Sequence, residues 1–143
     1  MIVDDKIMNY ILYQMRTEME VRRKCENLKY EPDKIDEIID YNKEAGYIDD
    51  SKYAKKYVEN ALRLKHQSAN ELKISLLKKG IDESTAEDVT STSEVYDFEY
   101  DSCKYNAKKK YESTNDILKV KKYLIAKGDR FEIINDILND ITW

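Results

Sequence analysis

The side chains in this sequence with the clearest capacity to bind a partner are lysines and arginines that occur in clusters. At helical spacings of three or four residues, cationic groups line up to contact successive phosphates of a nucleic acid. The alternative interpretation of each cluster is an ordinary solvated helix face. The candidate partner-binding or DNA-binding residues are Arg22, Arg23, Lys24, Lys52, Lys55, Lys56, Arg63, Lys104, Lys108, Lys109, Lys110, Lys121 and Lys122.

The charges are unevenly distributed along the chain. The 143 residues have a net charge of −4, but residues 50–81 have 8 basic and 3 acidic side chains, and residues 104–130 have 9 basic and 3 acidic ones. Between them, residues 82–103 have 8 acidic and no basic side chains. Such a striped chain predicts a surface that meets a partner exposing both protein and phosphate groups. The acidic block either repels DNA or forms the solvated side of a helix.

The residues usual in catalysis and metal binding are few and isolated. His66 is the only histidine and has no partner at motif spacing, so we interpret it as a surface loop residue. Cys25 and Cys103, the only cysteines, are predicted to be small, reduced, buried residues. No nucleotide-binding loop or zinc pattern is present. The sequence therefore predicts a binding protein that is not an enzyme and needs no cofactor or metal.

The tyrosines offer a second kind of contact. Tyr53, Tyr57 and Tyr123 are predicted to be core or semi-core residues with hydroxyls that reach water. Tyr105 and Tyr111 lie on either side of the run Lys108–Lys110, and aromatic rings beside lysines can stack on nucleic-acid bases. Packing between helical units is the alternative for these two rings.

Helix starts recur along the chain. Thr17–Glu20 and Ser68–Glu71 are capping boxes, in which a hydroxyl and a carboxylate satisfy the first free amides of a helix. Ser113–Asp116 has the same form with aspartate in place of glutamate. An apolar residue follows each box at the same offset, namely Val21, Leu72 and Ile117. The recurrence indicates an internal repeat of the length found in helical arrays.

Helix stops recur in register with these starts. Gly80 and Gly128 follow lysine-containing helix ends, Gly46 ends another helix, and Pro32 suits the first turn of the helix that Gly46 ends. Apolar residues at helical spacing mark further helices. These stripes are Val3, Ile7, Tyr10, Ile11 and Met15; Ile35, Ile38, Ile39 and Asn42; Tyr53, Ala54, Tyr57, Val58, Ala61 and Leu62; and Phe131, Ile134, Ile137, Leu138 and Ile141.

The predicted fold is all-α, with three tandem three-helix repeats that form an elongated, curved helical array. The predicted units are residues 1–49, 50–95 and 96–143, with 84–103 as a frayed helix end and a linker, and with Asp97 starting the next helix. We expect a monomer. Because no apolar run approaches the about 18 residues of a membrane helix and no signal-like N-terminus is present, we expect a cytoplasmic protein.

Three segments of the sequence resemble the RecX family of regulatory proteins. Gly46–Val58 is similar to the family signature of glycine, aromatic, aliphatic and paired aspartates followed by an aromatic, alanine and valine. Arg16–Lys24 is similar to the pattern of the first unit, and Leu72–Ile81 to that of the second. In the third unit, Asp129 and Arg130 separate Gly128 from Phe131, where the family often has glycine and phenylalanine in direct succession.

The resemblance implies three tandem three-helix repeats that bind the RecA recombinase, lodge in the groove of its filament on DNA, and restrain its ATPase and strand exchange. DNA phosphates would be a second contact. The segment Gly46–Val58 is expected to be a structural turn, with Tyr47 and Ile48 folded back and Asp49 or Asp50 capping the next helix. The alternatives are a helix-turn-helix-like DNA-binding protein, which would need exposed Arg, Asn or Gln on a recognition helix, and a helical scaffold for another protein.

Overall fold

The computed structural model describes residues 5–64 and 67–140, and this part of the chain contains only α-helices and the turns between them. The prediction of an all-α fold is therefore confirmed. The helices are α1 (Asp5–Tyr13), α2 (Glu18–Asn27), α3 (Pro32–Glu44), α4 (Asp50–Leu64), α5 (Ala69–Lys78), α6 (Glu83–Thr90), α7 (Ser93–Thr114), α8 (Ile117–Lys127) and α9 (Phe131–Asp140).

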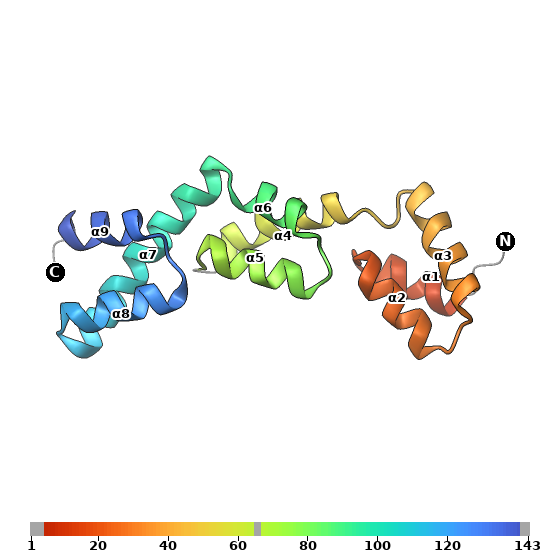
Figure 1. Cartoon of the computed structure of the whole chain (residues 1–143), viewed down its shortest axis with the longest axis horizontal. Coiled ribbons are helices and arrows are strands. Elements are labelled where there is room, and N and C mark those ends of the chain that lie inside the picture. The colour runs from red at the N-terminus through yellow and green to blue at the C-terminus, as the bar shows by residue number, and fades with distance from the viewer. Residues whose placement is uncertain (1–4, 65–66, 141–143) are drawn as a thin grey trace.

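The helices form an elongated row (Figure 1), and three hydrophobic cores follow one another along the chain. The first core lies among α1, α2 and α3 and includes Ile38. The second lies among α4, α5 and α6 and includes Leu72, and the third lies among α7, α8 and α9 and includes Leu124. Because each core is built from neighbouring helices, each group of three buries only one stripe per helix, which suits a chain that is 38% charged.

Two of the predicted capping boxes are present. The Glu20 amide donates to Thr17 Oγ1 at 3.1 Å, and the Thr17 amide donates to Glu20 Oε1 at 2.9 Å. Ser68 and Glu71 make the same pair of hydrogen bonds at 3.1 and 3.0 Å. α2 and α5 therefore start where the sequence predicts.

The third predicted capping box is wrong. Ser113 and Thr114 belong to the end of α7, where both hydroxyls donate to the Lys110 carbonyl at 2.9 Å. Asp116 caps α8 by itself, accepting from the amides of Leu118 and Lys119 at 3.0 and 3.3 Å. The buried residue that matches Val21 and Leu72 is consequently Val120, whereas Ile117 is 46% exposed.

The glycine stops adopt the left-handed conformation that the sequence predicts. Gly80 and Gly128, which follow α5 and α8, have φ angles of 90° and 94°. In the first unit Lys29 occupies the equivalent place after α2 with a φ of 61°. A side chain is therefore accommodated at Lys29. At Gly80 and Gly128, by contrast, another helix approaches closely.

The interpretation of 84–103 as a frayed end and linker is wrong. α6 ends at Thr90, and α7 begins at Ser93 with the Thr92 hydroxyl accepting from the Val95 amide at 3.3 Å. Asp97 lies inside α7 rather than at its start. The hydroxyl residues lower the helix propensity of this stretch, but they also supply the caps of a tight turn. α7 consequently spans the predicted boundary at 95/96, with Val95 in the second core and Cys103 in the third.

The turn after α3 largely follows the prediction. The amides of Tyr47 and Ile48 both donate to the Asn42 carbonyl, at 2.8 and 3.1 Å, and Ile48 is buried. Tyr47, however, is 49% exposed. Asp49 caps α4 by accepting from the Lys52 amide at 3.1 Å. Asp50 is thereby left available to contact a different helix.

Most of the predicted apolar stripes are buried. The exceptions are Met15 and Phe131, which are 40% and 63% exposed because each lies at or beyond the end of its helix, where the core is too short to cover it. Both cysteines are buried, as predicted. Val3, His66 and Ile141 lie outside the described residues.

Candidate partner-binding surface and the joints behind it

The predicted binding residues of α4 face solvent. These residues are exposed and lie opposite the side of α4 that packs into the second core; they are Lys52, Lys55, Lys56 and Arg63. Two of them have neighbours on the same helix: Lys56 Nζ lies 3.8 Å from Glu59 Oε2, and Arg63 donates to Asn60 Oδ1 at 3.1 Å. Such exposed contacts are weak, so these cations can exchange them for a partner.

The basic residues of α2 differ in whether they already contact other side chains of the protein. Arg22 lies 2.9 Å from Asp36 Oδ1, and this hydrogen bond is the main cause that raises the pKa of Arg22. Lys24 Nζ lies 5.4 Å from the centre of the Tyr10 ring. Arg23 is exposed and lines a hollow of about 350 Å³ together with Lys78 of α5. Arg23 is therefore the residue of this group that is best placed to contact a partner.

The predicted lysines of α7 and α8 are brought together in part. Lys110 Nζ lies 5.0 Å from the centre of the Tyr123 ring on α8, and Lys109 Nζ lies 5.5 Å from that of Tyr105. Lys109, Lys110 and Tyr123 line a hollow of about 260 Å³. Lys104, Lys108 and Lys122 are exposed, whereas Lys121 is half-buried.

The run Lys108–Lys110 does not form one face. Successive residues of an α-helix are rotated by about 100°, so the three ammonium groups spread around α7. Lys108 shares a side with Lys104, one turn earlier. The rings that bracket the run also differ, since Tyr105 is 43% exposed and Tyr111 packs against the third core. The basic surface is thus broader and less dense than the sequence suggests.

The three units are connected by two joints of the same design. In the first joint, the N-terminus of α2 meets the C-terminal end of α5: the Thr17 hydroxyl donates to the Lys79 carbonyl at 2.6 Å. The amide of Glu18 donates to Asp50 Oδ1 at 2.9 Å. A free amide of one helix and a free carbonyl of the next are therefore satisfied together.

The second joint repeats this arrangement one unit later. The Ser68 hydroxyl donates to the Lys127 carbonyl of α8 at 3.2 Å, and the Ala69 amide donates to Glu99 Oε1 at 2.7 Å. α2, α5 and α8 are thus placed end to end along one side of the molecule (Figure 1). We call this line of three helices the column.

Glycine makes both joints possible. A Cβ atom on Gly80 would lie 2.4 Å from Cβ of Met19, and a Cβ atom on Gly128 would lie 3.0 Å from Nδ2 of Asn70. Met19 and Asn70 occupy the same position near the start of α2 and α5. The glycines therefore do more than end a helix, since they allow the next helix to approach.

The second joint differs from the first by a group of buried charges. Glu99 is fully buried, and its Oε2 lies 3.0 Å from Nε of Arg130. Desolvation is the main cause that raises the pKa of Glu99. Burial also raises the pKa of Asp129 to about 6 and that of the Cys103 thiol to about 12. Lys127 Nζ lies 3.0 Å from Glu71 Oε1 across the same joint.

Sequence reasoning missed these buried residues. Glu99 lies within the acidic block and looks like one of many solvated acids. The only available signal was Asp129 and Arg130, which interrupt the family-like glycine and phenylalanine of the third unit. The structure places both at the second joint, with Arg130 also lying 5.2 Å over the centre of the Tyr96 ring.

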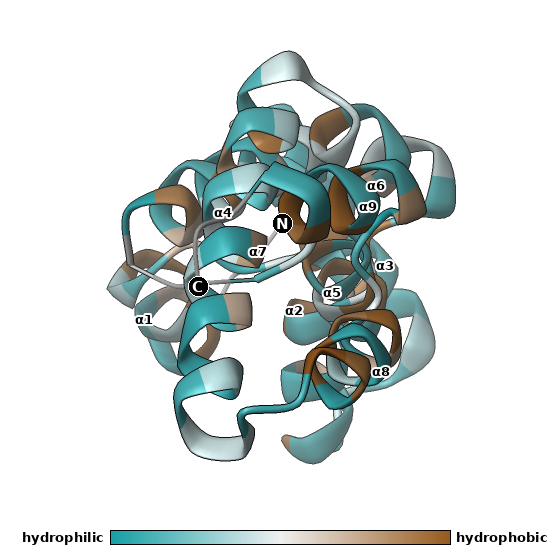
Figure 2. Cartoon of the chain, turned by 90° about the vertical axis from the view of Figure 1, so that its left-hand side faces the viewer, coloured by the Kyte–Doolittle hydropathy of each residue, from teal (hydrophilic) through white to brown (hydrophobic). Residues whose placement is uncertain are grey.

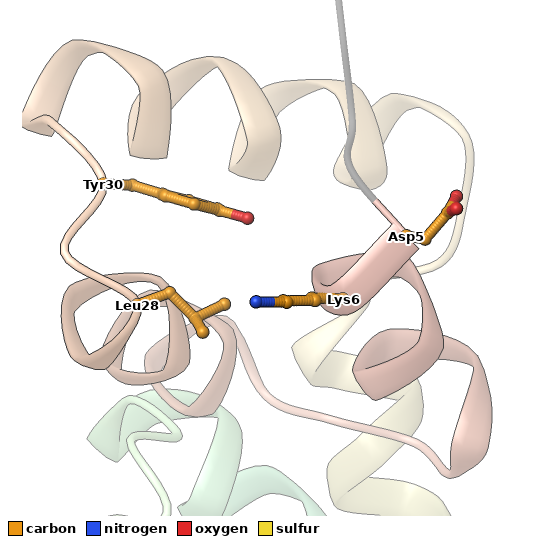
Figure 3. A pocket seen from close by; sticks show the side chains of 4 residues that line it. All are labelled: Asp5, Lys6, Leu28 and Tyr30. Atoms are coloured by element: carbon orange, nitrogen blue, oxygen red, sulfur yellow. The ribbon is translucent and has the colours of Figure 1, made fainter.

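A further hollow of about 350 Å³ lies on the outer end of the first unit (Figure 3). Leu28, the Lys6 ammonium and the Tyr30 hydroxyl point toward it, and Asp5 lies at its edge. The Tyr30 hydroxyl is buried without a hydrogen-bond partner among the described residues. The hollow contains no paired nucleophile and base, and it lies away from the predicted basic residues of α7 and α8.

Neither a metal centre nor a membrane span is found in residues 5–64 and 67–140. No group of three or more His, Cys, Asp or Glu side chains there is placed to hold a metal ion. No helix in these ranges is long and apolar enough to cross a bilayer.

Comparison with known proteins identifies the repeat. The model of RecX, second three-helix domain, matches residues 49–89, which include α4, α5 and all of α6 except its last residue, Thr90. The crystal structure of RecX from Lactobacillus salivarius superimposes with a TM-score of 0.84 at 30% sequence identity, covering 95% of this chain and 92% of that one. The chain belongs to the RecX family.

Two curated relatives are longer than this RecX-family chain. Regulatory protein RecX of Clostridium perfringens (strain SM101 / Type A) is 33% identical in an alignment of 134 residues that covers 89% of this chain and 62% of the relative. Regulatory protein RecX of Staphylococcus carnosus (strain TM300) is 32% identical in an alignment of 136 residues that covers 92% of this chain and 51% of the relative. The chain thus spans less than two thirds of the length of either.

Proposed function

We propose that this RecX-family chain regulates the RecA recombinase by binding its filament on DNA and restraining ATP hydrolysis and strand exchange. The observation that supports this most is the likeness, at a TM-score of 0.84, to nearly the whole of a solved RecX. The mode of action is binding without catalysis or a cofactor. The protein would act in the cytoplasm as a monomer.

The elongated shape supports a filament as the partner. A column built from successive units offers similar helix faces at regular intervals, and a filament offers similar subunits at regular intervals. Recombinase subunits would be the main contact, with DNA phosphates second. A sequence-reading DNA protein is less favoured, because α5, the middle helix of the second unit, exposes Ile74 and Leu77 and has Asn70 as its one residue of the Arg, Asn or Gln type.

The direct test follows ATP hydrolysis by preformed RecA filaments on single-stranded DNA while the purified protein is added. We expect hydrolysis to fall as the protein saturates the filament. Serum albumin at the same concentration is the control for nonspecific effects. Unchanged hydrolysis and unchanged strand exchange at a several-fold molar excess would refute the proposed function.

The contribution of DNA phosphates is tested by reversing charge. Changing Lys108, Lys109 and Lys110 together to Glu should weaken filament binding. It should also lower the salt dependence of the affinity, because a protein that contacts fewer phosphates displaces fewer counterions from the DNA. A second variant reverses Lys52, Lys55 and Lys56, the predicted basic cluster of α4, with the same change in net charge. Unchanged filament binding and unchanged salt dependence in either triple variant would mean that its lysines form only solvated surface.

A further inference from the structure

Four of the large apolar side chains that are exposed on the column lie on the side of α5 and α8 opposite the buried residues of these helices. Ile74 and Leu77 of α5 are 44% and 40% exposed, and Leu118 and Ile125 of α8 are 60% and 41% exposed. The chain as a whole is strongly hydrophilic, with a mean hydropathy of −0.78. Exposed apolar groups that gather on one surface of such a protein mark an interaction site. We call these four residues the apolar strip.

The four residues lie on the side of α5 and α8 that faces away from the cores, and Leu77 and Ile125 occupy equivalent positions in the two helices. In α5 the buried residues are Leu72 and Leu76, and in α8 they are Val120 and Leu124, four residues apart in each helix. At about 100° per residue, the members of the apolar strip lie on the opposite side of each helix. Figure 2, which views the molecule along its length, shows hydrophobic segments on α8 and on α5 behind it.

The strip continues from one helix to the other. The second joint places the N-terminus of α5 on the C-terminus of α8 through the Ser68–Lys127 hydrogen bond of 3.2 Å. The helices have 10 and 11 residues. At about 1.5 Å per residue, they give an edge about 30 Å long, which matches a partner helix of about 20 residues.

The charges beside the strip are basic. Lys78 follows Leu77, and Lys122 lies between Leu118 and Ile125; within the described part of the chain, neither lysine forms an ion pair. The carboxylates nearby are already engaged. Glu83 and Glu87 are paired with Lys73, at 3.8 and 2.8 Å, and Glu71 is paired with Lys127.

We propose that the apolar strip, with Lys78 and Lys122 beside it, is the docking site for an amphipathic helix of the partner protein whose apolar stripe is bordered by Asp or Glu. Apolar side chains at i, i+3 and i+7 recognise such a helix, and the lysines select acidic flanks. Phosphates alone provide no apolar surface against which the four apolar side chains could be buried. This inference rests on the proposed function, because the recombinase is the partner used to test it.

The experiment measures affinity for a RecA recombinase, both free and as a filament on single-stranded DNA, by biolayer interferometry. Ile74→Gln combined with Ile125→Gln removes apolar contact without changing charge or helix propensity greatly. We expect at least tenfold weaker binding to both forms of RecA. Circular dichroism must show the wild-type helix content, and Leu77→Gln alone provides a milder second variant.

Two controls separate the possible outcomes. Leu12→Gln with Tyr13→Gln changes exposed apolar residues in the first unit, 58% and 83% exposed, and should alter affinity less than twofold. Lys122→Glu should weaken binding three- to tenfold at low salt and less at high salt. Unchanged affinity of the folded Ile74/Ile125 variant would overturn the docking site while leaving the proposed function intact. Absence of binding by the wild-type protein would overturn both.

The remaining arms test other classes of ligand. The wild-type protein and the Ile74/Ile125 variant are also measured against single-stranded DNA alone and against vesicles of anionic phospholipid. We expect the two proteins to differ by less than twofold on either ligand. A strip-dependent loss of binding to vesicles or DNA, without a loss on RecA, would show that the strip serves that ligand and would overturn the assignment.

Discussion

The two joints of the column use the same backbone scheme but differ in how much charge they bury. In the first joint Asp50, which accepts the Glu18 amide, is half-exposed. In the second joint Glu99 performs the same task while fully buried. Removing a carboxylate from water is costly unless hydrogen bonds and a cation compensate, and Arg130 supplies that cation.

The difference teaches that one repeat design can give two connections with different properties. The first joint depends on close packing, since Met19 lies against Gly80. The second joint depends more on a set of polar partners that must all be in place, and such a set favours one geometry over others. We therefore expect the first joint to be sensitive to volume and the second to pH.

Gly80→Ala should cause the largest loss. The new Cβ would lie 2.4 Å from Cβ of Met19, and the residue has a φ of 90°, so strain and overpacking together should cost about 3 kcal/mol of unfolding free energy. Gly46→Ala is the matched control, because its φ is 82° but nothing lies within 4 Å of the added Cβ. It should cost about 1 kcal/mol. Urea denaturation measures both, and equal losses would show that packing at the first joint is loose.

Asp129→Asn should make the second joint more stable at neutral pH. Because the folded-state pKa is raised to about 6 from 3.8, the protonated form is favoured, and stability from this group falls as pH rises from about 4 to about 6. At pH 8 the variant should be about 3 kcal/mol more stable than the wild type, and at pH 4 about equal.

The measurement for Asp129 is the difference in unfolding free energy between variant and wild type across this pH range. The other titrating groups cancel in that difference. Asp129 faces Glu99, Lys127, Glu71 and Cys103, so each must keep its place in the variant. A difference that is the same at pH 4 and pH 8 would contradict burial of an ionised Asp129.

Thr17→Ala and Ser68→Ala should have the smallest effects, and similar ones. Each removes the hydroxyl that caps its helix, at a cost of about 1 kcal/mol, and that also donates across a joint, so each should cost about 1.5 kcal/mol in total, measured by urea denaturation. The corresponding change in the third unit, Asp116→Ala, removes a cap without a joint. If Asp116→Ala costs as much as the other two, the bonds across the joints add no stability.

Short-range patterns account for most of what the sequence predicted correctly. The boxes at Thr17 and Ser68 and the stops at Gly80 and Gly128 depend on contacts within about four residues, so they can be read without the fold. The third box failed because Ser113 and Thr114 had an equally local alternative in the last turn of α7. The candidate binding residues were recognised only as types, since exposure and charge pairing depend on neighbouring helices.

The sequence by itself determined the helices, their repetition and the likeness to RecX, because caps, glycine stops and apolar periodicity are local properties of the chain. Only the tertiary structure decided that Thr17 and Ser68 reach carbonyls 62 and 59 residues further along the chain. The same holds for the burial of Glu99 and the alignment of the apolar strip. These features arise where helices that are distant in the sequence contact each other. Such contacts produce no recognisable spacing of residues within either helix.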